Sequence, residues 1–439
     1  MSFVPAYILI LLGTILIDYW VGLRIDVSEG HRRKQWLWLS IGANIGILVL
    51  FKYLTFFTTI LQDIGLFPST LGTLHWLLPI GLSFHTLQAM GYTIEIYKRN
   101  QVPERHLGIF ALYVLFYPQL VAGPIERPQQ LLHQFRERHH FSYRMATNGL
   151  RLMLWGLFKK VVIADRLALV VDDVFAHPDT AMGPVILIGA LFFTLQIFCD
   201  FSGYTDIARG AAQIMGFRLM ENFNYPYAAA NIADFWRRWH ISLSSWLRDY
   251  VYIPLGGNRM GFWRKQLNLG ITFILSGLWH GANYTFVVWG ALHAFYQFVH
   301  QLFLELTKDK DDDDQQLTPF VSDLLFPTLT FASVVLAWIF FRANSVSDGL
   351  AMVFNLFSGW NVDGVDQVLA MPFTFTDWLV NWALLLGMLG MSVGLQHRGF
   401  ASWLAIQGRF LRYGIYYGLI LAIIFFGQTG SRSFIYFQF

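Results

Sequence analysis

Two histidines, each directly after a tryptophan, are the residues of this chain best suited to acid–base chemistry. They are His240 in the stretch DFWRRWHIS and His280 in LSGLWHG. Histidine has an unperturbed pKa of about 6.5, so it can take a proton from a hydroxyl group and return it near neutral pH. Because Gly277 and Gly281 flank His280, we expect room for a substrate beside its ring. The residues alone leave two roles open for His280, a catalytic base or a hydrogen-bonded core histidine.

The polar, tryptophan-rich segment 231–283 contains both histidines and stands out in an apolar chain. Ionised side chains in hydrocarbon are costly unless they are paired or face water, so charges here indicate a functional site. Arg237 and Arg238, together with Arg248, could hold the phosphates of a coenzyme A donor or could anchor the chain against lipid headgroups. A catalytic metal is not expected, because no HExxH-like grouping accompanies the histidines.

The composition indicates an integral membrane protein. Of the 439 residues, 55% are hydrophobic and 13% are charged, whereas soluble domains carry about 25% charged residues. The net charge of +3 is too small to argue for nucleic acid. Cys199 is the single cysteine, so we expect neither an internal disulfide nor a cysteine-based zinc cluster. Serine-hydrolase and nucleotide-binding motifs are absent from the sequence, which leaves those enzyme classes without support.

The apolar runs and basic loops predict how the first part of the chain crosses the membrane. Val4–Leu23 and Leu37–Phe57 are long enough to span, and four basic residues lie between them. By the positive-inside rule this loop is cytoplasmic and the N-terminus lies outside. Leu74–Ile96 then returns inward. Leu107–Val121 is short and ends at a Gly-Pro break, so we expect a re-entrant or half-buried helix there.

Further along, the chain mixes apolar helices with charged ones. Lys159–Phe175 predicts an amphipathic interfacial helix or a solvated face. Val185–Phe198 predicts a buried helix that the sequence CDFSGYTD breaks, with Asp200 and Asp206 capping helix ends or pairing with arginines. The later spans are predicted at Ala282–Leu304, Leu324–Phe341, Trp378–Leu395 and Tyr413–Gly427. The expected fold is an all-α polytopic membrane protein with one integral-membrane domain over residues 1–439.

Several longer motifs make the chain similar to a known family. They are DFWRRWHISLSSWLRDYVYIPLGGNR, LSGLWHGANYTFVVWG, FYPQLVAGPIERP, FCDFSGYTDIARG, AWIFFRA and the terminal SFIYFQF. Together they resemble the membrane-bound O-acyltransferase (MBOAT) family, and within it the bacterial branch that O-acetylates alginate, peptidoglycan and other extracellular polysaccharides. The resemblance implies a helical bundle with re-entrant or half helices around a central passage. It places the catalytic core at about residues 79–343 and a tail motif at 433–439.

The resemblance also implies a function and its participants. It predicts an acetyltransferase of the bacterial inner membrane that takes acetyl from cytoplasmic acetyl-CoA, without a bound cofactor or metal, for an exported cell-envelope polysaccharide. An extracytoplasmic serine acyltransferase of the SGNH type is the implied partner, besides membrane lipid. His280 holds the position of the catalytic histidine, and His240 that of a second important one. Residues expected to line the donor site or the passage are Trp236, Arg237, Arg238, Trp239 and Trp279.

The terminal SFIYFQF leaves two roles open. Aromatic residues could anchor the tail at the membrane interface. The motif also resembles the tail of a small partner protein in teichoic acid D-alanylation, in which a tyrosine is proposed to carry the acyl group. Tyr436 would then take the acetyl group, with His280 as its base, and pass it to the partner's serine.

Two other functions stay open at this point. One is D-alanyl transfer to teichoic acid, because that pathway's membrane subunit shares the WHG histidine. The other is a transporter or lipid flippase, since charged residues in broken helices at membrane depth also occur in transporters.

Overall fold

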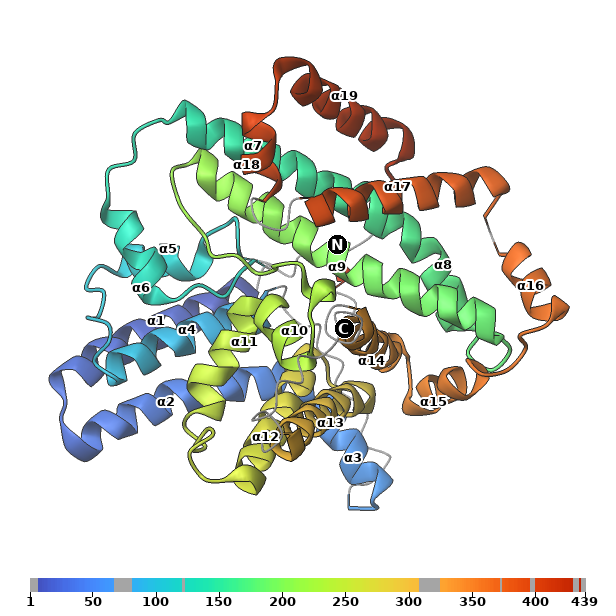
Figure 1. Cartoon of the computed structure of the whole chain (residues 1–439). Coiled ribbons are helices and arrows are strands. Elements are labelled where there is room, and N and C mark those ends of the chain that lie inside the picture. Colours follow the sequence, from blue (N-terminus) through green and yellow to red (C-terminus); the bar gives the residue numbers. More distant parts are fainter. Residues whose placement is uncertain are drawn as a thin grey trace. The chain divides into compact units, whose positions relative to one another are not determined.

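All regular secondary structure in the described part of the chain is helical, which confirms the predicted all-α class (Figure 1). The computed structural model describes residues 7–66, 81–120, 123–307, 324–371, 373–394, 399–428 and 434–435. The chain forms two compact units, one of Met1–Ser142 with Ala212–Met220 and the other of Tyr143–Ala211 with Glu221–Phe439. The expectation of a single membrane domain stays a prediction.

The first unit is built from the N-terminal helices, which are α1 (Tyr7–Val27), α2 (Gly30–Leu48), the π-helical η1 (Val49–Tyr53), α3 (Leu54–Asp63), α4 (Leu82–Tyr97), α5 (Leu107–Leu115), α6 (Pro128–Leu131) and the 3₁₀ segment η2 (Leu132–Arg136). Helices α1, α2 and α4 pack on one another. A buried carboxylate joins the first two, because Asp18 accepts hydrogen bonds from Ser40 and Asn44 of α2. Helix α5 is only about 14 Å long at 1.5 Å per residue, so it cannot span a bilayer, as the re-entrant prediction requires.

The second unit contains both histidines of the WH motifs. Its elements are α7 (Tyr143–Leu157), the π-helical η3 (Phe158–Ala164), α8 (Asp165–Ala176), α9 (Gly183–Ile214), η4 (Pro226–Ala228), α10 (Ile232–Arg238), α11 (Ile241–Leu247), the π-helical η5 (Arg248–Tyr252), α12 (Phe262–His280), α13 (Tyr284–Thr307), α14 (Phe326–Arg342), α15 (Val346–Asn355), α16 (Val362–Leu369), α17 (Phe375–Gly394), α18 (Phe400–Ile406) and α19 (Arg409–Phe426). Helices α12, α13 and α14 pack in sequence, and buried aromatic side chains of α9, α10, α13 and α14 form the core.

Helix α9 corrects the prediction of a break at CDFSGYTD. It runs unbroken from Gly183 to Ile214, through both aspartates. Each carboxylate pairs with a lysine of the neighbouring segment η3, Asp206 with the buried Lys159 at 2.7 Å and Asp200 with the half-buried Lys160 at 2.6 Å. Because the charges are paired, the helix can carry them without ending. The partners are lysines, with one weaker arginine contact 3.8 Å from Asp206, rather than the expected arginines alone.

The same ion pairs correct the first part of the prediction of an amphipathic interfacial or solvated helix at residues 159–175, whereas Asp173 in α8 is exposed. The first turns of this stretch are a π-helical segment, and Lys159, Asp165 and Arg166 are all buried there. Their charges pair inside the protein instead of facing lipid headgroups. π-Helical turns occur frequently at functional sites.

Four helical stretches in the described residues are long and apolar enough to cross a membrane. They are Ile8–Val27, Gly30–Gln62, Gly183–Ile214 and Arg409–Phe426, and Phe326–Arg342 is a shorter apolar helix. These stretches agree with the first two predicted spans and with those predicted near residues 324 and 413. The first residues of the predicted span Leu74–Ile96 lie outside the described part.

Candidate active site

His240 is fully buried at the junction of α10 and α11. Its backbone lies in the left-handed region, with φ at +43°. Non-glycine residues adopt this conformation rarely, and such strained positions cluster at functional sites. The sharp turn directs the chain from one short helix into the next and places the imidazole inside the second unit.

Asn222 holds the ring of His240. The side-chain oxygen of Asn222 accepts hydrogen bonds from the Ser242 backbone N–H at 3.1 Å and from the Ser242 hydroxyl at 3.0 Å, and it lies 3.2 Å from His240 Nδ1. The Ser242 backbone N–H can only donate, so it fixes the amide orientation of Asn222. Nδ1 of His240 therefore carries the proton in the neutral ring, and Nε2 has the lone pair. In this tautomer the ring is an acceptor at Nε2 and not a donor.

Burial lowers the pKa of His240 to about 3. The unfolded chain titrates at about 6.5, so between these values the folded state binds fewer protons than the unfolded state. Folding with a neutral His240 therefore carries no penalty above about pH 6.5. As the pH falls from 6.5 toward 3, the unfolded chain is stabilised by taking up a proton that the folded chain does not bind, so the free energy of unfolding decreases. We expect acidification from pH 7 to pH 5 to lower the free energy of unfolding by about 2 kcal/mol through this residue. Unfolding in detergent at these pH values should show a weaker dependence in His240→Gln, and equal dependence would contradict the assignment.

His280 is the last residue of α12 and lies against the ring of His240. The two ring centroids are 6.4 Å apart. The His280 side chain is 6% exposed, with Trp289 and Phe341 edge-on at 5.2 Å each. Trp279 lies beside both imidazoles, at 4.9 Å from His280 and 6.0 Å from His240. The tertiary structure thus brings together the two WH motifs in one aromatic enclosure.

The glycines around His280 serve helix packing rather than the expected substrate access. A Cβ atom on Gly277 would come within 2.1 Å of the Phe286 carbonyl oxygen on α13, and one on Gly281 within 2.0 Å of the Phe286 ring. Gly290 faces the Phe273 carbonyl in the same way, at 2.4 Å. These positions let the backbones of α12 and α13 approach closely and so fix the end of α12 that carries His280.

The tryptophans of the predicted passage occupy different environments. Trp239 is 1% exposed and packs among Phe223, Phe235 and Trp338 in the core. Trp236 is half-buried, and its indole N–H donates to Nδ1 of His293 at 3.3 Å. Trp239 therefore supports the site through packing, whereas Trp236 has an accessible face.

A cavity of about 390 Å³ lies beside that face of Trp236. Three cationic side chains line it, namely Arg237, Arg248 and Lys265. Its deeper wall includes Ser276, one helical turn before His280. Arg238 is not among its lining residues. Arg237 and Arg238 both bond to Asp234, at 3.3 and 2.8 Å, and Arg248 bonds to Asp249 at 2.8 Å. The structure therefore places two of the three predicted arginines, Arg237 and Arg248, on the wall of a basic cavity and Arg238 outside that wall.

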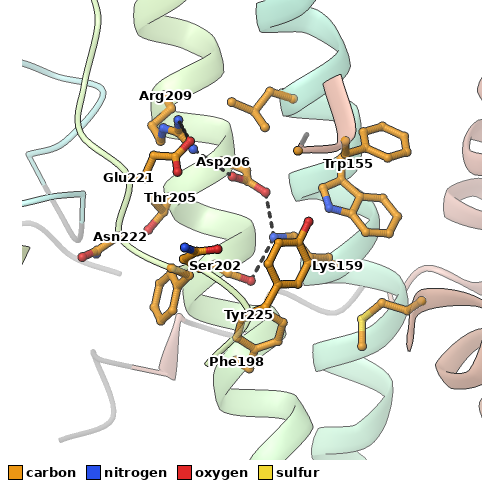
Figure 2. Close-up of a pocket in the computed structure, with 16 residues that line it drawn as sticks. Trp155, Lys159, Phe198, Ser202, Thr205, Asp206, Arg209, Glu221, Asn222 and Tyr225 are labelled. Atoms are coloured by element: carbon orange, nitrogen blue, oxygen red, sulfur yellow. Dashed lines mark hydrogen bonds and ion pairs between the residues drawn. The ribbon is translucent and has the colours of Figure 1, made fainter. Parts of the chain in front are cut away.

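A second cavity, of about 370 Å³, lies between η3, α9 and residues 221–225 (Figure 2). Lys159 reaches across it to Asp206 and to the Ser202 hydroxyl, at 2.7 and 2.9 Å. Arg209 bonds to Glu221 at 2.7 Å on the same wall. Asn222 also faces this cavity, so one side chain connects its lining to His240.

Sequence reasoning missed two residues of this site. Asn222 carries no recognisable signal, because its role depends on the position of Ser242 and His240. His293 is fully buried on α13, and a histidine inside an apolar run was a visible signal of function. Within the described ranges, no cluster of three or more histidine, cysteine, aspartate or glutamate side chains has the arrangement of a metal site. Tyr436, the predicted acyl carrier, lies outside the described residues.

Comparison of the sequence with models of protein families identifies the class of this protein. The model of the membrane-bound O-acyltransferase family matches residues 105–339, a range that includes both histidines, α9 and the two cavities' main elements. The chain belongs to the membrane-bound O-acyltransferase family. This confirms the resemblance drawn from the motifs and identifies the protein as an O-acyltransferase.

The relatives of this acyltransferase include several bacterial polysaccharide-modifying proteins. It is 42% identical to the probable alginate O-acetylase of Pseudomonas putida, over 79% of this chain and 70% of that protein. It is 36% identical to the peptidoglycan O-acetyltransferase of Helicobacter pylori, over 79% and 69%. A teichoic acid D-alanyltransferase of Bacillus subtilis is 28% identical over 52% of this chain and 60% of that protein. The acyltransferase thus spans about two thirds of the length of the relatives that it matches.

Proposed function

We propose that this acyltransferase moves an acetyl group from cytoplasmic acetyl-CoA across the bacterial inner membrane for the O-acetylation of an exported polysaccharide. The observation that carries the proposal is the contact of His280 with His240 at the end of α12, one helical turn beyond a cavity with three cationic side chains. The relatives named as O-acetylating enzymes, at 36 and 42% identity, support acetyl over D-alanyl transfer. The relative named as a D-alanyltransferase is less similar, at 28%.

His280 is the general base of the proposed reaction. It removes the proton from an attacking hydroxyl group while the oxygen forms a bond to the thioester carbonyl carbon. The tetrahedral oxyanion then collapses, the carbon–sulfur bond breaks, and His280 returns the proton to the leaving thiolate. Because His240 accepts at Nε2 in its neutral tautomer, the Trp279 indole N–H is the better candidate to stabilise the oxyanion. In this scheme Asn222 orients the ring of His240, and His240 packs beside His280 and keeps its ring in place.

The basic cavity is the proposed donor site. Coenzyme A carries several phosphate charges, and Arg237, Arg248 and Lys265 provide matching cations. The apolar wall of Trp236 and Phe273 suits the uncharged arm that leads toward Ser276 and His280. This arrangement lets the anionic end stay near water while the thioester enters the helical core.

Arg237→Ala and Arg248→Ala are expected to raise KM for acetyl-CoA by about tenfold or more each, with a small effect on kcat. A hydrogen bond to a charged group is worth about 1.5–3 kcal/mol, which corresponds to this range. Arg238→Ala is the matched control, because Arg238 lies on the same helix as Arg237 and bonds to the same Asp234, but does not line the cavity. An equal increase in KM in all three variants would indicate a general surface effect and would contradict the donor site.

The acceptor in the proposed relay is the Tyr436 hydroxyl. A tyrosine has a pKa of about 10, so it needs a base to attack at neutral pH. His280 would take its proton, and acetyl-tyrosine would form as the coenzyme A thiolate leaves. The serine of an extracytoplasmic SGNH-type partner would then attack this ester and regenerate the tyrosine hydroxyl. Phe434 and Ile435, directly before Tyr436, are buried in the same unit as the histidines.

Purified protein in lipid vesicles with radiolabelled acetyl-CoA provides the test of the proposed function. We expect label to leave coenzyme A and to appear on protein or, with the partner and glycan present, on polysaccharide. Label transfer from a D-alanyl donor instead would support teichoic acid modification. Movement of a solute across the vesicle without acyl transfer would support a transporter and refute the proposal.

A further inference from the structure

The C-terminal segment of the chain is held at two points by one surface of the second unit. The Gln428 backbone N–H donates to the Val161 carbonyl oxygen of η3 at 3.0 Å. The Ile435 backbone N–H donates to a carboxylate oxygen of Asp200 on α9 at 2.7 Å. The two hydrogen bonds lie on either side of residues 429–433. Both η3 and α9 therefore contact the C-terminal segment, at Gln428 and Ile435 respectively.

The carboxylate that binds Ile435 is an unusually well-defined acceptor. Asp200 is 2% exposed, and its other oxygen lies 2.6 Å from the Lys160 ammonium. Lys160 also bonds to Asp165 at 2.8 Å. Two carboxylates thus share one ammonium in the interior, which fixes the orientation of the Asp200 side chain. A backbone N–H bonded to such a charged, immobile group gives a stronger interaction than a neutral turn contact.

Aromatic packing places the same segment beside the histidine site. The Phe434 ring lies 4.9 Å from Tyr204 and 5.9 Å from Phe201, both on α9. Phe201 also contacts His240, with ring centroids 4.7 Å apart. One aromatic side chain therefore separates the tail from the imidazole that contacts His280.

We propose that η3 and the facing turn of α9 form a dock for the C-terminal segment, in which Asp200 positions the Ile435 backbone and so holds the chain that leads to Tyr436. The positional part of the proposal rests only on the contacts above, and its purpose rests on the proposed acetyl relay. Tyr436 is joined to Ile435 by one peptide link, and consecutive Cα atoms are about 3.8 Å apart. Fixing the Ile435 amide therefore restricts where the tyrosine can reach. Asp200 is a positioning residue in this scheme, because it acts through the tail and not on the substrate.

The second lysine–aspartate pair offers a matched control for the dock. Lys159 with Asp206 joins the same two elements as Lys160 with Asp200, and each pair has one buried and one half-buried member. The partners of Asp206 are Lys159 and Arg209 rather than the described tail residues, and Asp206 faces the cavity of Figure 2. Asp200→Asn and Asp206→Asn therefore each remove one carboxylate charge of α9 that is paired with a lysine of η3. Only the first is expected to affect the tail.

Hydrogen exchange of the C-terminal peptide measures docking without any need for activity. We expect exchange at the Ile435 amide to become at least about tenfold faster in Asp200→Asn, since a hydrogen bond to a charged group is lost. Asp206→Asn should leave it unchanged. Because Lys160 stays paired with Asp165 when Asp200 is neutralised, Asp200→Asn leaves no unpaired buried charge, and the melting temperature of each variant checks that the chain is folded. Slow exchange in Asp200→Asn, or equal acceleration in Asp206→Asn, would overturn the dock.

A change on the tail itself tests positioning without touching the ion pair. Ile435→Pro deletes the N–H donor, whereas Ile435→Ala shortens the side chain and keeps the donor. The mass of the C-terminal peptide after incubation with acetyl-CoA reports acetyl loading. We expect at least about tenfold less loading in Ile435→Pro than in Ile435→Ala. Equal loading in the two would overturn the positioning role. A wild-type tail that is protected from exchange but never acetylated would refute the relay of the proposed function and leave the dock standing.

Discussion

His280→Ala is expected to lower acetyl transfer by about 10²–10⁴-fold, to below a tenth of the wild-type rate under any saturating condition. General-base catalysis contributes this range, and we expect no neighbouring group to replace the imidazole. The ring lies at the end of α12 beside His240, Trp279 and Phe341, so its position is fixed by packing. The measurement is initial-rate transfer from labelled acetyl-CoA in vesicles, together with the melting temperature of each variant.

Two further variants make the result for His280 specific. His280→Gln fills more of the aromatic enclosure than alanine does and should be as inactive, which separates lost chemistry from lost folding. His177→Ala is the control for removing a histidine, since His177 is exposed and follows α8 away from the site. A folded His280→Ala protein that keeps more than about a tenth of the activity would show that another group is the base.

Tyr436→Phe is expected to abolish transfer to the extracytoplasmic partner, because phenylalanine lacks the hydroxyl group that would carry the acetyl ester. The substitution keeps the ring and its apolar surface, so an interfacial anchoring role of the tail would survive. The direct measurement is the mass of the C-terminal peptide after incubation with acetyl-CoA and without the partner. The wild-type peptide should gain one acetyl group and the variant peptide none.

The adjacent aromatic residue provides the control for the tail. Phe437→Leu changes the apolar surface of the same motif without removing a hydroxyl group, and it should keep most of the activity. If Tyr436→Phe acetylates glycan at the wild-type rate, the acetyl group does not travel through this tyrosine. His280 would then act on a hydroxyl group supplied from outside the chain.

The sequence by itself determined the class of the protein and the two catalytic candidates. An apolar chain with few charges and apolar runs of about 20 residues indicates a helical membrane protein, because a helix of that length spans the bilayer with its backbone polar groups satisfied. The short apolar run at 107–121 also predicted a helix that cannot span, and α5 is one. His240 and His280 could be named because each stands in a tryptophan-flanked motif, and such local patterns need no knowledge of distant contacts.

Only the tertiary structure decided how charged and small residues are used. α9 continues through Asp200 and Asp206 because two lysines of another segment, forty or more positions earlier in the chain, neutralise them. Gly277 and Gly281 are required by the approach of Phe286 rather than by a substrate. A spacing pattern describes one element at a time, so it cannot tell which charge meets which or what fills the space beside a glycine.

The protonation of His240 and the place of the tail depend on the same kind of distant contact. The Nδ1 proton follows from one amide oxygen of Asn222, whose orientation is fixed by the backbone of Ser242. Ile435 reaches Asp200 across 235 positions of sequence. Such pairs form because folding buries a polar group that must then find a partner, and the partner is selected by three-dimensional proximity. The sequence thus supplied the chemical groups, and the packing of the helices decided their protonation, their partners and their distance from the proposed acyl carrier.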